Sequence, residues 1–296
     1  MSRPAQDPRP AASTVAPGPL PDAALLIDKP VGLTSHDVVH RVRRAVGGRK
    51  AGRVGHTGTL DPFATGLLIV LLGRATRLQD HLMGQDKTYE TLARLGATST
   101  TGDPEGEITV TGVLPPDPLA LPTGLVRQRP PAYSAIRIDG ERAYKRARRG
   151  EEVLVPEREV TVHAFDQLSR QGDRARFRIR CSSGTYVRTL VADLGDAYCL
   201  ELRRTAIGPY EVTAAQDPDT PRDEWRLLPL HDLLATVMPT VELDADQARR
   251  AGHGQRIELP DAPVADELGL RHAGEAIAIG RREADGRIHP VVGFRA

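Results

Sequence analysis

One acid, Asp61, lies in a stretch whose composition suits a fixed reactive group. The stretch Gly55–Gly66 reads GHTGTLDPFATG, and Pro62 follows the acid directly. Glycine permits positive φ angles and proline fixes φ, so a carboxylate in such a turn has little freedom to swing into solvent. The apolar run that follows, LLIVLL from Leu67, predicts a buried strand or a short buried helix. The sequence therefore predicts a carboxylate held at the edge of the core; a structural turn in which Asp61 only caps the next element is the alternative.

Two basic stretches indicate an anionic partner. The first precedes the Asp61 loop and contains Arg41, Arg43, Arg44, Arg49, Lys50 and Arg53. The second, ERAYKRARRG from Glu141, predicts a short helix carrying Arg142, Lys145, Arg146, Arg148 and Arg149. Tyr133 and Tyr144 are interleaved with the second stretch, and basic plus aromatic side chains suit phosphate contact and base stacking. Solvated helix faces are the alternative for both.

A cation occupies an unfavourable place in the stretch CSSGTYVRTL from Cys181. We expect a helix from about Tyr186, which puts Arg188 in the first turn, where the helix dipole disfavours positive charge. This placement predicts a carboxylate or phosphate partner for Arg188.

Composition narrows the class of protein. The chain has 296 residues with 40 Lys and Arg against 39 Asp and Glu, so its net charge of +1 identifies no partner. Its only two cysteines, Cys181 and Cys199, lack metal-ligand spacing, which argues against a disulfide framework or a zinc site and fits a reducing compartment. No apolar run approaches the roughly 20 residues that span a bilayer, and the start of the chain lacks a secretory h-region. We expect a cytoplasmic protein with no membrane segment and no metal.

The pattern of elements predicts two ordered parts after a tail. Residues 1–22 are rich in Pro and Ala and predict disorder. Strands are expected at 25–27, 87–95, 159–165, 175–181 and 202–210, and helices at 34–46, 141–150, 232–237 and 244–251, with one more from 186. Residues 109–131 give no firm element. After residue 237, short strands around an Asp285–Gly286 hairpin predict a small β-barrel-like module.

Taken in chain order, these stretches resemble the TruB family of bacterial tRNA pseudouridine-55 synthases. The first signature is LLIDKPVGLTSHDVV from Leu25, and the second is AGRVGHTGTLDPFATG from Ala51. The third is CSSGTYVRTL, followed by Leu202-Arg203-Arg204. KTYE from Lys87 and PPAYSA from Pro130 fit between them, and the C-terminal module is similar to a PUA domain.

The resemblance implies a fold and an activity. The fold is α+β: a pseudouridine synthase domain over residues 23–237, with a central mixed, mostly antiparallel sheet and a catalytic cleft. An RNA-gripping insertion would occupy about 130–153, and a β-barrel-like PUA-type domain 238–296. The implied activity is isomerisation of uridine-55 in the tRNA T loop to pseudouridine by a monomer, with no cofactor or metal.

The same resemblance assigns roles to individual residues. Asp61 would be the nucleophile, attacking uracil C6 or ribose C1′, and Arg188 the cation that keeps it ionised. Tyr89 would stack on the flipped-out base and is a candidate for proton handling. The further substrate contacts would be His56, Tyr186 and Leu202, with Lys29 and Pro30 supporting the loop and the five basic residues of the 141–150 helix binding RNA.

Two segments depart from the family pattern, and three other functions would share some of these sequence features. The segment DAYCLE before Leu202 is shorter than the family pattern, and residues 109–129 lack a clear amphipathic helix. A non-catalytic RNA-binding protein or tRNA-folding chaperone would use the same basic stretches but would need neither Asp61 nor Arg188. A phosphate-binding NTPase loop would need Gly-Lys-Ser/Thr, and this loop ends Ala64-Thr65-Gly66. An aspartate glycosidase would need a second carboxylate in the signature motifs.

Overall fold

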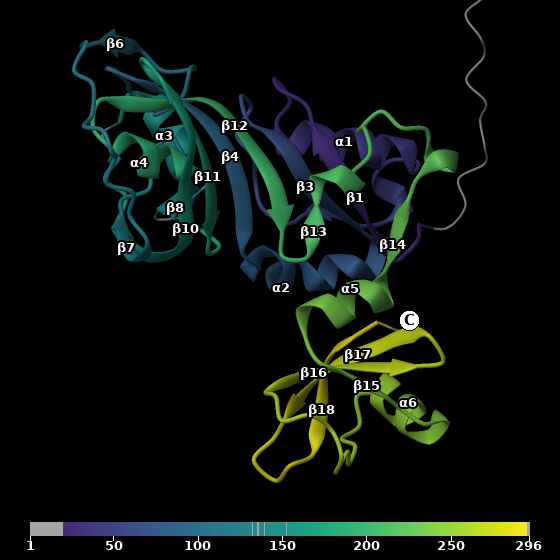
Figure 1. Cartoon of the computed structure of the whole chain (residues 1–296). Helices are drawn as coiled ribbons and strands as arrows, with labels where there is room; N and C mark the ends of the chain where they lie inside the picture. Colours follow the sequence, from purple (N-terminus) through teal and green to yellow (C-terminus); the bar gives the residue numbers. More distant parts are fainter. Residues whose placement is uncertain (1–19, 132, 135, 139, 152, 295–296) are drawn as a thin grey trace, which may run out of the picture.

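A large sheet forms the main body, and a small sheet lies beyond it (Figure 1). The computed structural model describes residues 20–294 except 132, 135, 139 and 152. The large sheet runs in the order β14 (Leu227–Pro229), β1 (Ala23–Lys29), β3 (Thr65–Leu72), β12 (Ala197–Ile207), β4 (Lys87–Leu95), β11 (Arg174–Cys181), β10 (Arg158–Gln171) and β7 (Gly124–Gln128), with β13 (Tyr210–Glu211) on β12 and β2 (Val54–His56) on β3. Among these described strands, the pairing of β12 with β3 is parallel and the others are antiparallel.

The apolar run after the Asp61 loop is a strand, β3, buried on both faces. Leu67, Ile69 and Leu71 enter one hydrophobic core, and Leu68, Val70 and Leu72 enter another. Successive side chains of a strand point to opposite faces, so a strand covered on both sides must be apolar throughout. Burial on both faces explains why the run is apolar throughout, a pattern from which the sequence alone could not distinguish a strand from a short helix.

Helices cover the faces of the large sheet. The predicted helix after Thr34 is confirmed as α1 (Ser35–Ala45): Thr34 and Asp37 form a capping box, and Val38, Val39 and Val42 are buried. The remaining helices of this part are α2 (Gln79–Gly84), α4 (Val187–Ala192) and α5 (Leu230–Val237). The insertion holds β8 (Arg137–Ile138), β9 (Glu141–Arg142) and α3 (Ala143–Arg148), and β5 (Ala97–Ser99) pairs with β6 (Ile108–Val110).

Several elements differ from the sequence-based expectation. The helix predicted at 141–150 is the strand β9 followed by α3, and β10 continues beyond the predicted end at 165 to Gln171. β7 lies in the region for which no firm element is predicted; it is an edge strand with a mixed exposure pattern, so its sequence carries no alternation. β12 begins at Ala197, well before the predicted start at Leu202, because a register shift between Cys199 and Glu201 breaks the period-two pattern.

The C-terminal sheet consists of β15 (Thr240–Glu242), β16 (Glu267–His272), β17 (Glu275–Arg282) and β18 (Ile288–Gly293), in that order. Helix α6 (Ala245–Gly252), capped by Asp244, packs on it over a small core that includes Ile257 and Leu270. The sheet is open: within the described residues β15 does not pair with β18.

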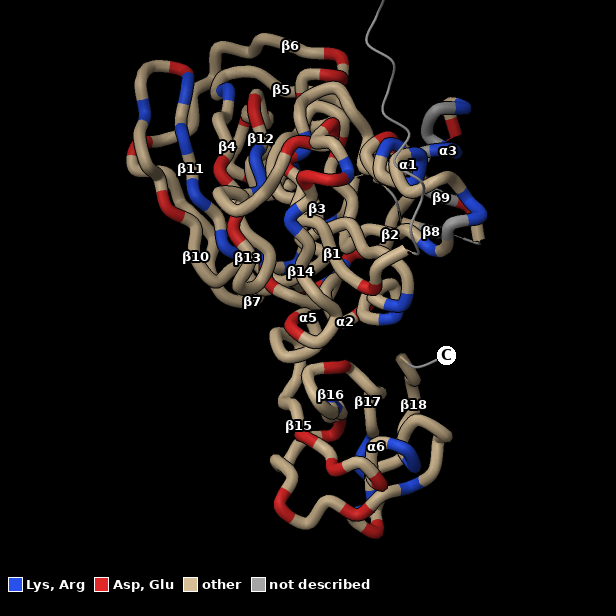
Figure 2. The backbone as a smooth tube through the Cα atoms, turned by 90° about the vertical axis from the view of Figure 1, so that its right-hand side faces the viewer, with Lys and Arg blue, Asp and Glu red and all other residues tan. Residues whose placement is uncertain are grey.

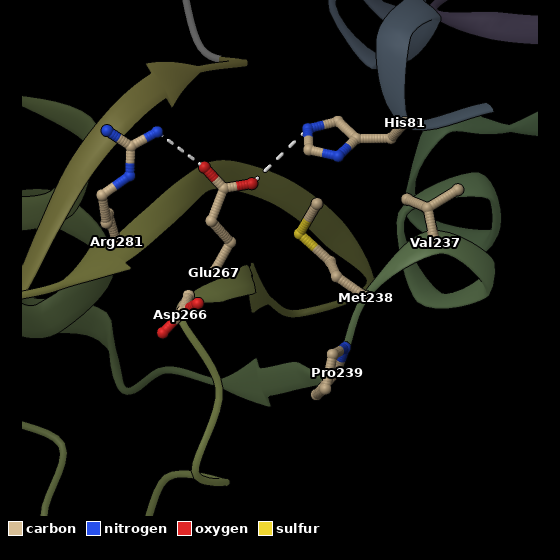
Figure 3. A pocket seen from close by; sticks show the side chains of 7 residues that line it. All are labelled: His81, Val237, Met238, Pro239, Asp266, Glu267 and Arg281. Carbon is tan, nitrogen blue, oxygen red and sulfur yellow. Dashed lines mark hydrogen bonds and ion pairs between the residues drawn. The ribbon is translucent and has the colours of Figure 1, made fainter. Parts of the chain in front are cut away.

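The two sheets share a core at α5. Leu233 and Leu234 pack with Ile279 and Phe294 of the C-terminal part and with the β1–β3 face of the large sheet. A pocket of about 520 Å³ lies at the same junction (Figure 3). There Glu267 of β16 lies 3.8 Å from His81 of α2 and 2.8 Å from Arg281 of β17.

The predicted tail lies outside the described residues except for residues 20–22. Leu20 packs against the core under α1, and Asp22 accepts hydrogen bonds from the backbone and side chain of Arg74, both at 2.6 Å. Among the described helices, none has the length and apolar character needed to cross a membrane.

Candidate active site

The Asp61 loop joins β2 to β3 and is tied to α1. Ser35, the first residue of α1, is buried; its hydroxyl accepts from Leu60 N at 2.8 Å and donates to Leu60 O at 3.2 Å. The Asp61 carbonyl accepts from Ala64 N at 3.1 Å. The residue before the acid and the turn after it are therefore fixed, while the Asp61 side chain keeps 32% of its surface exposed. A rigid but accessible carboxylate suits reaction with an incoming substrate.

The turn at Lys29 and Pro30 supports the other side of the loop. The fully buried Lys29 ammonium donates to Pro30 O, Leu33 O and Pro62 O at 3.0, 2.7 and 3.3 Å. Gly32 N also donates to Pro62 O, at 2.8 Å. Burial lowers the pKa of Lys29 to about 8, and the Asp61 carboxylate opposes this shift. Lys29 thus holds the residue directly after the acid, whereas Pro30 is exposed.

Arg188 lies between two carboxylates. Its Nε is 3.0 Å from Asp61 Oδ2, and its Nη1 is 2.8 Å from Asp103 Oδ2. Nη1 also donates to Thr101 O at 2.7 Å, and Nη2 donates to Tyr133 O at 3.0 Å. Burial raises the pKa of Asp61 and the Arg188 guanidinium opposes it. The carboxylate partner expected for a cation in the first turn of α4 is therefore present. The Arg188 guanidinium in turn favours the ionised form of the Asp61 carboxyl group.

Asp103 is a site residue that the sequence analysis missed. It is 3% exposed, and its second oxygen accepts from Thr101 Oγ1 at 2.6 Å and Glu105 N at 3.0 Å. It lies in the turn between β5 and β6, far from the signature motifs. The signal that could have found it is an Asp-Pro pair, Asp103-Pro104, like that at Asp61-Pro62.

Replacing Asp103 with Asn should slow the reaction and shift its acid limb. Arg188 loses the charged partner that fixes its Nη1. For the activity that the family resemblance implies, we therefore expect a single-turnover rate about 10–100-fold lower with tRNA affinity little changed. The Asp103 charge raises the pKa of Asp61, so its removal lowers that pKa and moves the acid limb of the pH–rate profile to lower pH. A pH–rate series for both proteins measures this; an unchanged rate and limb would contradict a positioning role for Asp103.

Tyr89 and Leu202 come together around one hydrophobic core. Leu202 is buried on β12, and Tyr89 of β4 packs against this cluster with Phe63 of the loop. Burial raises the pKa of the Tyr89 hydroxyl. Tyr186 precedes α4 and is held through its backbone: the buried Gln128 amide donates to Tyr186 O at 2.9 Å and accepts from Tyr186 N at 2.7 Å.

The remaining predicted residues lie on β2 and in the insertion. His56 ends β2, opposite Val70 of β3. In the insertion, Lys145 is exposed, Arg146 pairs with Glu151, and Arg149 pairs with Glu141 and Glu151. The side chains of Arg142 and Arg148 lie outside the described part. Figure 2 shows the basic residues of α3 and its neighbouring strands. Within the described residues, no cluster of three or more His, Cys, Asp or Glu could hold a metal ion.

Comparison with known proteins agrees with this architecture. The model of the TruB family pseudouridylate synthase N-terminal domain matches residues 43–187. The chain is 44% identical over 259 residues to tRNA pseudouridine synthase B of Thermobifida fusca, covering 80% of this chain and 86% of that protein. It is 44% identical over 257 residues to the protein of the same name from Cupriavidus metallidurans, covering 81% of each.

Solved structures agree in fold. A chain of the archaeal box H/ACA sRNP Nop10-Cbf5 complex superposes with a TM-score of 0.68 at 20% identity, covering 93% of this chain and 86% of that one. A chain of a Cbf5-Nop10-Gar1 complex gives 0.64 at 24% identity, covering 88% and 78%. The protein thus has an α+β pseudouridine synthase fold with a small C-terminal sheet. With relatives this similar over most of their length, the chain belongs to the TruB family of pseudouridylate synthases.

Proposed function

We propose that this protein isomerises uridine-55 in the T loop of tRNA to pseudouridine. The observation that carries the proposal is the ion pair of Asp61, on its fixed loop, with the buried Arg188. The isomerisation breaks the C1′–N1 bond and forms a C1′–C5 bond, with loss of the C5 proton and gain of one at N1. An ionised Asp61 can open this sequence by attack at uracil C6 or ribose C1′.

The other site residues have the side-chain types expected to bind a flipped-out base. Base flipping requires an apolar wall and an aromatic face in the pocket. Leu202 and Tyr89, which pack in one core, would provide these, and Tyr186 would add a second aromatic contact. His56 would enter the space that the base vacates. The basic insertion would hold the T stem-loop, and the C-terminal module would add RNA contacts, in a cytoplasmic monomer.

The test is pseudouridine formation on an unmodified tRNA transcript. Wild-type protein should convert the T-loop uridine, and a transcript with cytidine at that position should yield no product. Binding of both transcripts without product would favour the non-catalytic RNA-binding or chaperone function. Product at another uridine would contradict the T-loop assignment.

A further inference from the structure

Arg204 is a buried cation to which the sequence analysis gave no role. It follows Leu202 and Arg203 on β12, and only 1% of its surface is exposed. Arginine stays protonated in proteins, so this is a full charge inside the core. Within the described part of the chain, no carboxylate lies within ion-pair distance of it, in contrast to Arg203, which pairs with Asp28. Burying a charge without a counter-ion costs free energy, so the contacts of Arg204 should indicate its role.

Its hydrogen bonds join the two ends of the Asp61 loop. Nη2 donates to Gly58 O at 3.1 Å, and Nε donates to Leu67 O at 2.7 Å. Gly58 precedes Asp61 and Leu67 follows it, so one planar guanidinium fixes both sides of the segment that carries the acid. The backbone of Arg204 also lies next to the end of this loop, because β12 runs parallel to β3 there and Arg204 is opposite Gly66.

On its other side, Arg204 faces Tyr89. The two residues lie directly opposite each other in the antiparallel pairing of β12 with β4, and opposed residues put their side chains on the same face. Burial raises the pKa of the Tyr89 hydroxyl, and the Arg204 guanidinium lowers it against this larger effect. The Arg204 charge also favours the ionised form of Asp61, in addition to Arg188. One residue therefore holds the loop that carries Asp61 through its side chain and lies opposite the tyrosine expected to face the base.

We propose that Arg204 is a positioning residue that sets the separation between the Asp61 loop and the Tyr89 ring, the space that the flipped uracil must enter. The proposal rests on the proposed function. A guanidinium is needed because it is rigid and donates in several directions from one plane. Lysine could carry the charge but could not hold Gly58 O and Leu67 O with one planar geometry.

The experiment compares Arg204→Lys with the wild type, alone and in a Tyr89→Phe background. We expect Arg204→Lys to lower the single-turnover rate about 10–100-fold while tRNA affinity changes less than about threefold. Tyr89→Phe removes the hydroxyl on which the opposite Arg204 charge acts, so the same change should cost distinctly less in the second background. Arg176→Lys, at an exposed arginine of β11 paired with Glu201, controls for Arg-to-Lys replacement in this sheet and should match the wild type.

A second readout does not depend on activity. Amide hydrogen exchange over residues 57–66 should be faster in Arg204→Lys than in either the wild type or Arg176→Lys, at a temperature where all three are folded. An unchanged rate with unchanged exchange would overturn the proposal, as would a rate loss of equal size in both tyrosine backgrounds. If the wild-type protein formed no pseudouridine, the proposed function would fail, and the exchange comparison would still decide whether Arg204 holds the loop.

Discussion

Asp61→Asn should abolish pseudouridine formation while leaving tRNA binding within about threefold of wild type. Asparagine has nearly the shape of aspartate but is no nucleophile, so we expect a rate loss of at least about 10³-fold. Arg188 keeps Asp103 as a charged partner, and the loop keeps its anchors at Ser35 and Lys29. The substitution therefore removes chemistry and little structure.

The measurement is tritium release from a tRNA transcript labelled at uridine C5, because the isomerisation expels that hydrogen. Enzyme in excess over RNA gives a single-turnover rate, and a host strain without its own enzyme avoids contamination. Asp166→Asn, at an exposed residue of β10, is the matched control and should react at the wild-type rate. Turnover by purified Asp61→Asn at the control's rate would exclude Asp61 as the nucleophile.

Gly66→Ala should destabilise the fold by about 3–5 kcal/mol, or prevent folding. Gly66 has φ +102°, which an L side chain rarely adopts. An added Cβ would lie 2.2 Å from Arg204 O and 2.8 Å from Arg204 N. Both are backbone atoms of a central strand, so neither can move aside without breaking the pairing of β12 with β3.

Chemical denaturation of Gly66→Ala and Gly172→Ala separates the two causes of this loss. Gly172, in the turn between β10 and β11, also has positive φ, at +56°, but an added Cβ there meets nothing within 4 Å. Backbone strain alone should cost about 1–2 kcal/mol in that control. Equal losses at both positions would show that close approach to β12 contributes nothing.

The sequence predicted best the features that depend on neighbours along the chain. β4 was expected at Lys87–Leu95 and occurs there, and the cap at Thr34 and the alternation of Ala175, Phe177, Ile179 and Cys181 were equally local signals. The pairing of Arg188 with Asp61 followed from the family resemblance and an unfavourable helix position. The roles of the site residues stay predictions.

Contacts between distant segments could not be predicted where neither a local pattern nor the family resemblance indicated them. Asp103 reaches Arg188 because the β5–β6 turn folds back over α4, and no local pattern records that approach. Arg204 looks in the sequence like its neighbour Arg203; strand register sends one into the core and the other to Asp28. β7 was missed because an edge strand with little burial leaves no periodic trace.

The core shared across α5 bears on how the protein is made. One face of β3, the strand that anchors the Asp61 loop, packs in the same cluster as Ile279 and Phe294. Those two residues are synthesised after β3, so the nascent chain holds an incomplete core until they have left the ribosome. A chain that ended before Ile279 would leave apolar side chains of β3 exposed next to the loop that carries Asp61. We expect such a chain to misfold or aggregate rather than bind tRNA.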